Sequence, residues 1–192
     1  TLTVAGDFTT SGGLIGKSCF DFNGASGLIN CGSDSSIDNT FDSGGSFEAW
    51  INADSDGEGD TGRIARKAVG GGSAAGWTIF VSGQKVVFYH HFDGDDAQWT
   101  TTNNVLTFGK WHHFAATYNN GATTNDPIIY IDGKQVLLTE DSTPTGTRDS
   151  DAAQSLIIGN QDDDSKTFDG RIAMVRLFSD IRTEAELRTD MF

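Results

Sequence analysis

The sequence predicts an all-β protein, an antiparallel β-sandwich with one short C-terminal helix. Short apolar and aromatic runs recur between clusters of Gly, Asn and Asp, a spacing typical of strands joined by turns rather than of alternating strands and helices. The 24 Gly and 13 Phe among 192 residues agree, because turns need conformational freedom and strands favour bulky side chains. A chain of this length can form one domain with a sizeable core.

The N-terminal stretch differs from the rest of the chain. "TLTVAGDFTTSGG" is rich in Thr and Gly and alternates Leu2, Val4 and Phe8, which predicts an edge strand or a linker ending near Gly16. The expected organisation is therefore an N-terminal strand or linker over residues 1–16, followed by one domain over residues 17–192.

"KSCFDFNGASGLINCG" contains the only two cysteines, Cys19 and Cys31, in two β-like runs equidistant from Ala25. A hairpin centred on Ala25 would place the cysteines opposite each other, within reach of a disulfide. Two small buried thiols are the alternative, and the sequence leaves both open.

Alternation in the middle of the chain predicts three core-facing strand sides, formed by Phe47, Ala49 and Ile51, by Trp77, Ile79 and Val81, and by Phe114, Ala116 and Tyr118.

Two local signals mark the second half of the chain. In "IIYIDGKQVLL", the pair Asp132-Gly133 between apolar runs predicts a type I′ hairpin turn. In "RTEAELRTD", Thr183 and Glu186 form a capping box, which predicts a short helix that buries Leu187.

The charge balance excludes some classes of partner. The net charge of −14 comes from 27 acidic and 13 basic residues, so nucleic acid, whose binding requires phosphate neutralisation, would be repelled. Cations, neutral glycans or simple solubility remain compatible with an acidic surface. No apolar run approaches the roughly 18 residues of a membrane span, so no membrane insertion is expected.

The acidic stretch "NADSDGEGDTG" allows a metal loop, a catalytic cluster or a solvated turn. Sandwich glucanases hold their carboxylates as ExDxE or ExDxxE along one strand, and this motif is absent. An EF-hand would need a bidentate Glu where Ala65 stands. The pairs His90-His91 and His112-His113 can each offer only one ring to a given strand face, so hydrogen-bonded strand histidines are expected.

The ordered set "WHHFAATYNN", "IIYIDGKQV", "SLIIGNQ" and "FDGRIAMVRLFSDIRTEAEL" resembles the laminin G-like and pentraxin group of concanavalin A-like jelly rolls. With "FDFNGASGLINCG" and "SFEAWINA" the resemblance covers roughly residues 17–190. "HFAATY" is similar to the pentraxin signature HxCxxW, but Ala115 and Tyr118 replace its Cys and Trp. The resemblance implies two antiparallel sheets, with calcium at one face and a glycan or anionic group bound through or beside it.

The resemblance also implies which residues would hold the calcium ion. "GDTGRIARK" matches the first ligand loop through Asp60 and Thr61, and "IIGNQDDD" matches the second through Gln161, Asp162 and Asp163. Laminin G-like modules suggest an alternative site at Asn23 and Asp169, although Ala173 stands where relatives carry Asp.

A glycan site needs an exposed aromatic ring among polar residues, because the ring offers apolar area to a sugar. Trp99 in "GDDAQWTTTNN" is the first candidate and Tyr89 the second, whereas Trp50, Trp77 and Trp111 lie in apolar runs typical of packing.

The predicted function is a non-catalytic binding module, calcium-dependent and glycan-binding, with a glycan or cell-surface polysaccharide as partner and an extracellular or virion-surface location. The first alternative is a structural or adhesive module of a phage tail fibre or cell-surface protein, because the N-terminal stretch resembles the Thr/Gly strands of tail fibres. The second alternative is a sandwich-fold glucanase or polysaccharide lyase.

Overall fold

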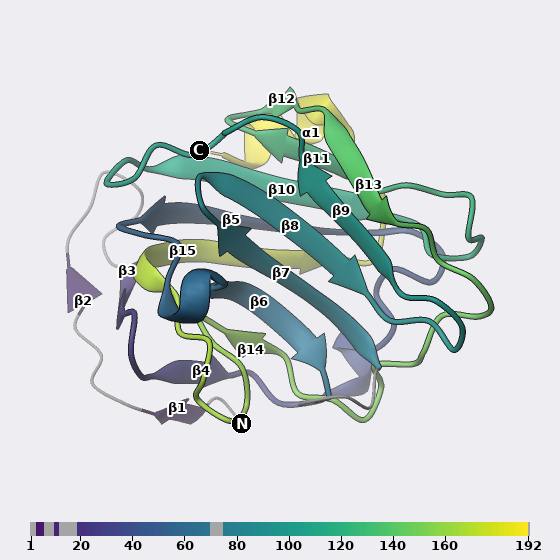
Figure 1. Ribbon diagram of the computed structural model, residues 1–192, viewed down its shortest axis with the longest axis horizontal. Coiled ribbons are helices and arrows are strands. Elements are labelled where there is room, and N and C mark those ends of the chain that lie inside the picture. Colours follow the sequence, from purple (N-terminus) through teal and green to yellow (C-terminus); the bar gives the residue numbers. More distant parts are fainter. Residues whose placement is uncertain (1–2, 6–9, 12–18, 70–74, 192) are drawn as a thin grey trace.

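The protein is a sandwich of two antiparallel β-sheets (Figure 1). The computed structural model describes residues 3–5, 10–11, 19–69 and 75–191. Within these residues the strands form an eight-stranded sheet, ordered β1-β4-β14-β6-β7-β8-β9-β13, and a seven-stranded sheet, ordered β12-β11-β10-β5-β15-β3-β2. The predicted fold class is confirmed.

The elements have the following bounds. The eight-stranded sheet contains β1 (Thr3–Ala5), β4 (Leu28–Asn30), β6 (Arg63–Ala68), β7 (Gly76–Ser82), β8 (Lys85–His90), β9 (Ala97–Thr101), β13 (Leu138–Ser142) and β14 (Ile157–Ile158). The seven-stranded sheet contains β2 (Thr10–Ser11), β3 (Cys19–Asn23), β5 (Gly45–Ala53), β10 (His112–Tyr118), β11 (Ile128–Ile131), β12 (Lys134–Gln135) and β15 (Asp169–Phe178). Two short 3-10 helices, η1 (Ser35–Ile37) and η2 (Glu58–Asp60), lie in loops, and the α-helix α1 (Glu184–Asp190) follows β15.

The core lies between the sheets and is rich in aromatic residues. All nine side chains of the predicted core faces are at most 1% exposed, which confirms them: Phe47, Ala49, Ile51, Trp77, Ile79, Val81, Phe114, Ala116 and Tyr118. Phe41, from the loop before β5, packs edge-on against Trp77 with ring centroids 5.3 Å apart. Each large aliphatic or phenylalanine side chain buried here contributes about 1.5–3 kcal/mol of hydrophobic stabilisation.

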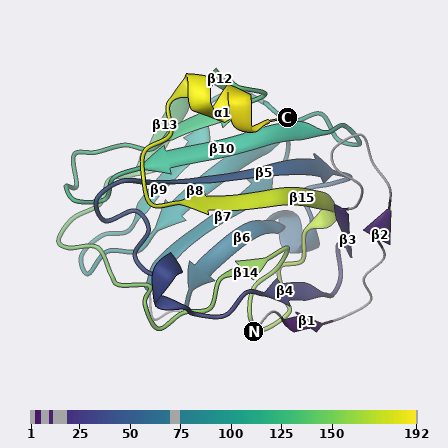
Figure 2. The same cartoon turned by 180° about the vertical axis from the view of Figure 1, so that it is seen from behind.

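The helix α1 covers part of the outer face of the seven-stranded sheet (Figure 2). Its capping box is confirmed, because Thr183 accepts a bond from the backbone N–H of Glu186, whose side chain accepts from the backbone of Thr183. Leu187 is fully buried against Ala115 and Tyr130. None of the helices in the described part of the chain has the length and apolar character that a membrane crossing requires.

The predicted type I′ turn is also confirmed. Asp132 and Gly133 both have positive φ, 52° and 69°, and join β11 to β12. The following run "KQVLLTE" is not one strand, because β12 pairs with β11 while β13 pairs with β9 in the other sheet.

The predicted hairpin around Ala25 is wrong. β3 pairs with β15 and β2, whereas β4 pairs with β14 and β1, so the chain crosses from one sheet to the other at this turn. The crossing lets Phe22 and Ile29 enter the core from facing sheets, at 2% and 3% exposure. Both cysteines lie among the described residues, and no disulfide joins them.

The N-terminal strands add to the sheet edges. β1 pairs with β4 in one sheet, and β2 pairs with β3 in the other. The predicted boundary between residues 16 and 17 lies outside the described residues.

Candidate functional site

A groove of about 430 Å³ opens on the outer face of the eight-stranded sheet, and we call it the outer-face groove. Strands β6 to β9, which supply its floor, lie side by side in the layer nearest the viewer in Figure 1. The lining residues come from these strands and from two loops at their end: Thr61, Arg63, Arg66, Val69, Thr78, Phe80, Tyr89, His91, Gln98, Gln161 and Lys166.

One row of directly opposed residues crosses the groove floor. Arg66 pairs with Thr78, Thr78 with Tyr89, and Tyr89 with Gln98. Residues opposite each other in neighbouring strands share one face of a sheet, so this register fixes a polar row with one aromatic ring.

A second row adds Arg63 opposite Phe80. Residues 63 and 66 are an odd number apart and would point to opposite faces of a regular strand. A register shift between Arg63 and Ala65 inserts an extra residue, and the resulting bulge lets Arg63 and Arg66 line the same groove.

The Tyr89 ring is held by its neighbours. Its hydroxyl donates to Asp96 Oδ2 at 2.5 Å, and its ring centroid lies 4.8 Å from that of His91. Burial and the Asp96 carboxylate raise the pKa of Tyr89, so the phenol stays protonated. The ring is therefore a fixed part of the groove wall.

The two arginines of the groove differ in their partners. Arg66 donates to Asp162 Oδ1 at 2.5 Å and to the carbonyl of Val69. The guanidinium of Arg63 lies over the Phe80 ring, 4.6 Å from its centroid, and its buried Nε has no hydrogen-bond partner among the described residues. Burial, with the nearby charge of Arg66, lowers the pKa of Arg63 to about 10, which still leaves a cation at neutral pH.

The two loops predicted to share a calcium ion do lie side by side. Glu58 Oε2 accepts hydrogen bonds from the backbone N–H and the hydroxyl of Thr167, both at 3.0 Å. Thr61 and Gln161 line the outer-face groove. Asp60 is exposed, in a left-handed conformation with φ 58°.

The carboxylates of the second loop are engaged within the protein. Asp162 is paired with Arg66, and Asp163 Oδ1 accepts from Gln161 and Ser165 at 2.8 and 2.7 Å. Hydrogen bonds from Ser165 and Gln161 hold the pKa of Asp163 below its usual value. No group of three or more His, Cys, Asp or Glu side chains in the described ranges is placed to hold a metal ion. As arranged, these donors do not fit a calcium ion.

The alternative pair, Asn23 and Asp169, is adjacent across β3 and β15. Asn23 Oδ1 accepts from the backbone of Ala25 and Ser26, and Asp169 Oδ2 accepts from Ser55. These oxygens stabilise turns.

The prediction that Trp99 presents a sugar-stacking face is wrong. Trp99 is 1% exposed, its ring stacks on Phe88, and its indole N–H donates to Asp126 at 2.9 Å. Polar neighbours in sequence suggested exposure, but strand alternation turns Gln98 outward and Trp99 into the core. Of the two predicted aromatic residues, only Tyr89 lines the outer-face groove.

The sequence interpretation missed Arg63, Arg66 and Phe80. Phe80 was detectable, because it alternates with the buried Ile79 and Val81. The arginine pair was not, since the bulge that brings both to one face has no local sequence signal.

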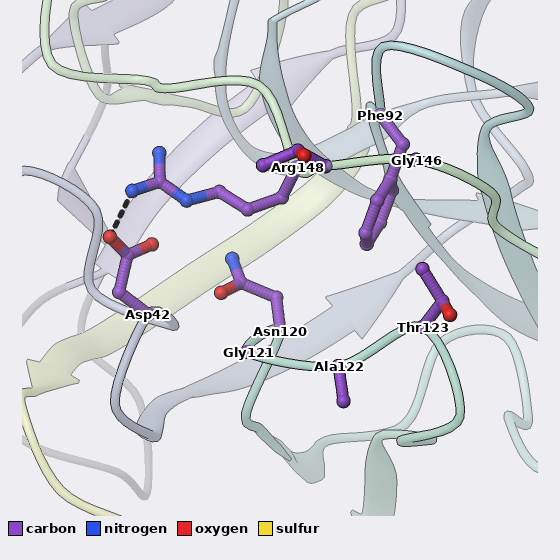
Figure 3. A pocket seen from close by; sticks show the side chains of 9 residues that line it. Asp42, Phe92, Asn120, Gly121, Ala122, Thr123, Gly146 and Arg148 are labelled. Atoms are coloured by element: carbon purple, nitrogen blue, oxygen red, sulfur yellow. Dashed lines mark hydrogen bonds and ion pairs between the residues drawn. The ribbon is translucent and has the colours of Figure 1, made fainter.

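A second pocket, of about 300 Å³, lies between loops at the sandwich rim (Figure 3). Arg148 pairs with Asp42 across its wall, and Asn120 donates its amide N–H to His90 Nε2 at 3.1 Å. Buried oxygens of Asp42 and Asn120 have no hydrogen-bond partner among the described residues. The charged side chains of this pocket, Arg148 and Asp42, pair with each other.

Glu48, between Phe47 and Ala49 on β5, has a fully buried carboxylate. It accepts from Arg176 at 2.6 Å and lies 3.5 Å from His113 Nε2. The other histidines also have protein partners, with His112 Nδ1 2.9 Å from Asp132. The interpretation of hydrogen-bonded strand histidines is confirmed for His112 and His90, whereas the polar contact of the His113 side chain is the ion pair with Glu48.

Comparison with solved structures finds similar folds among binding domains. The binding domain of Paraclostridial Mosquitocidal Protein 1 is 15% identical, with a TM-score of 0.74 over 100% of this chain and 47% of that chain. The binding domain of botulinum neurotoxin DC in complex with rat synaptotagmin II is 14% identical, with a TM-score of 0.72 over 100% and 46%. The same domain in complex with SialylT is 15% identical, with a TM-score of 0.70 over 100% and 46%.

This chain spans less than half the length of these structures, and identities this low show a shared fold alone. No curated protein matches the sequence significantly. The family model for the concanavalin A-like lectin/glucanases superfamily, Laminin G type 3, matches residues 23–188 and so includes nearly all of both sheets. The chain belongs to this laminin G-like family of the concanavalin A-like superfamily.

Proposed function

We propose that the protein is a non-catalytic module that binds a glycan in the outer-face groove. The observation that carries the proposal is the pair of cross-strand rows, which place Tyr89 beside Thr78 and Gln98 and add Phe80 in the second row. Gln161, from the loop after β14, lines the same groove. Aromatic faces offer apolar area to sugar rings, while amides and hydroxyls bond to sugar hydroxyls. The volume of about 430 Å³ lies within the range usual for ligand sites.

The comparisons support a binding role in general terms. The similar structures are binding domains, one in complex with a protein and one with SialylT. A glycan or cell-surface polysaccharide as partner, and an extracellular or virion-surface location, are parts of the proposal that this likeness favours. The family resemblance predicts calcium dependence. Because the carboxylates of the second loop are engaged within the protein, we propose instead that glycan binding in the groove does not require calcium.

A glycan array probed with the wild-type protein, with and without calcium, tests the proposal. We expect binding, and we expect Tyr89→Ala to weaken it by about tenfold, because the stacking ring is lost. Tyr89→Phe is the matched control, since it keeps the ring and removes only the bond to Asp96. Melting curves verify that each variant is folded.

Two results would contradict the proposal. One is the absence of binding to every glycan by the folded wild-type protein. The other is full binding by Tyr89→Ala, which would place any glycan site elsewhere on the surface.

A further inference from the structure

The charge of the outer-face groove is opposite to that of the chain. The protein carries a net charge of −14, yet Arg63, Arg66 and Lys166 line the groove and no Asp or Glu is among its described lining residues. Gathering three of 13 basic residues around one groove leaves a local positive field on an acidic molecule. Arg66 is neutralised by Asp162, so the basic side chains of the groove without an ion pair to a described residue are Arg63 and Lys166.

Arg63 is fixed in place and has no direct anionic partner among the described residues. The charge of the Asp163 carboxylate acts only from a distance and partly offsets the lowering of the Arg63 pKa by burial. Its guanidinium lies on the Phe80 ring, its Nε is buried without a hydrogen bond, and it forms no ion pair with a described residue. Removing a cation from water without a counter-charge in direct contact costs free energy, and an anion that binds the guanidinium directly recovers part of it. The planar guanidinium fork matches a carboxylate or sulfate with two parallel hydrogen bonds.

Lys166 completes the cationic end of the groove. It belongs to the loop after β14, and its backbone accepts a bond from the N–H of Arg63 at 3.0 Å. Its ammonium lies near Gly59, where an added Cβ would approach to 2.9 Å. Like Arg63, it forms no ion pair with any residue that the structure describes, so two free cations border the same space.

We propose that the glycan bound in the outer-face groove is acidic, and that its carboxylate or sulfate group is held by Arg63 with Lys166. This inference rests on the proposed glycan-binding function. Tyr89 would hold the sugar ring while the cationic end selects its charge. A long polyanion is disfavoured, because the acidic remainder of the surface would repel its other charges within about one Debye length, roughly 8 Å.

The test uses pairs of probes that differ in one acidic group: 3′-sialyllactose against lactose, galacturonate against galactose, and 3′-sulfated lactose against lactose. Affinities are measured by calorimetry at two salt concentrations. We expect an acidic member to bind at least about tenfold more tightly than its neutral partner, since a charged hydrogen bond contributes more than a neutral one. Added salt should reduce this difference.

Substitutions assign the effect to the residues. Arg63→Gln should weaken binding of the acidic probe by about tenfold or more and leave the neutral probe unchanged, and Arg63→Lys should lose less. Lys166→Gln should act in the same direction. Arg171→Gln and Lys110→Gln remove the same charges outside the groove and should have no effect.

The outcomes separate the inference from the proposed function. Equal binding of acidic and neutral probes, or unchanged acidic binding in folded Arg63→Gln and Arg63→Lys, overturns the inference while the loss of binding in Tyr89→Ala upholds the glycan site. If no probe and no glycan on the array binds, the proposed function fails and the inference fails with it.

Discussion

At the scale of single residues, His90 shows how a polar side chain is accommodated in the core. It is 2% exposed, its Nδ1–H donates to the carbonyl of His91 at 3.1 Å, and its Nε2 accepts from Asn120. Both ring nitrogens are thus used in the neutral form. Burial is the main cause that lowers the pKa of His90 to about 4.

The lowered pKa of His90 predicts a pH dependence of stability. In the unfolded chain the ring titrates near 6.5, so the unfolded state binds the proton more readily below this pH. The contribution of neutral His90 is complete above about pH 6.5 and is lost as the pH falls toward 4. The loss is on the order of 3 kcal/mol.

Urea unfolding of the wild type and of His90→Gln, at pH 7 and at pH 4.5, measures this effect. Titrating carboxylates change the free energy of unfolding of both proteins by the same amount. The relevant quantity is therefore how much more the free energy of unfolding falls between pH 7 and pH 4.5 in the wild type than in His90→Gln. We expect a shallower decline for His90→Gln. Equal declines would mean that His90 is not kept neutral by the fold.

At the scale of elements, local patterns predicted what depends on neighbouring residues. The alternation of β5, β7 and β10, the turn at Asp132-Gly133 and the capping box at Thr183 each involve a few consecutive residues, and all are confirmed. The hairpin at Ala25 failed because pairing partners are chosen by the whole sheet, and burial of Phe22 and Ile29 on facing sheets favoured a crossing.

Site residues follow the same rule. Tyr89 was predictable because it is an aromatic residue next to polar residues in an apolar strand run. Trp99 was misplaced because its polar neighbours in sequence do not reveal which face of β9 points into the core. The positions of Arg63 and Arg66 in the groove depend on the bulge after Arg63. The orientation of Arg66 depends also on its ion pair with Asp162, which lies 96 residues away in the sequence. Such contacts have no signature in a single sequence.

The capping box predicts the effect of a substitution on α1. Thr183→Ala removes the hydroxyl that accepts from Glu186 N–H, and should lower the free energy of unfolding by about 1 kcal/mol. Thr189→Ala is the matched control, because its hydroxyl bonds only to Ala185 O within the helix and alanine favours helix. Hydrogen exchange of the α1 amides should accelerate in the first variant alone.

An unchanged exchange rate in Thr183→Ala would indicate that packing alone keeps α1 in place. The contact that would do so is Leu187 against Ala115 and Tyr130.

At the scale of the whole molecule, the sandwich brings together two acidic loops about a hundred residues apart in sequence, as the family resemblance implied. The same contact places Asp162 on Arg66 and leaves Arg63 and Lys166 facing the groove. The proximity of the two loops was therefore predictable from the family resemblance. The positive charge of the groove beside them was not, because it comes from Arg63 and Lys166. A cation-lined groove favours an anion over a metal ion.

This charge arrangement makes a prediction about calcium that concerns the stability of the whole fold. A bound ion at a hundredfold excess over its dissociation constant would stabilise the folded state by about 2.7 kcal/mol and raise the melting temperature. Asp162 forms an ion pair with Arg66, and Asp163 accepts hydrogen bonds from Gln161 and Ser165. Because these carboxylates already have protein partners, we expect neither calcium nor EDTA to shift the melting temperature. A calcium-dependent rise that disappears in Asp163→Asn, but persists in the control Asp141→Asn on β13, would contradict this expectation and place calcium at the paired loops.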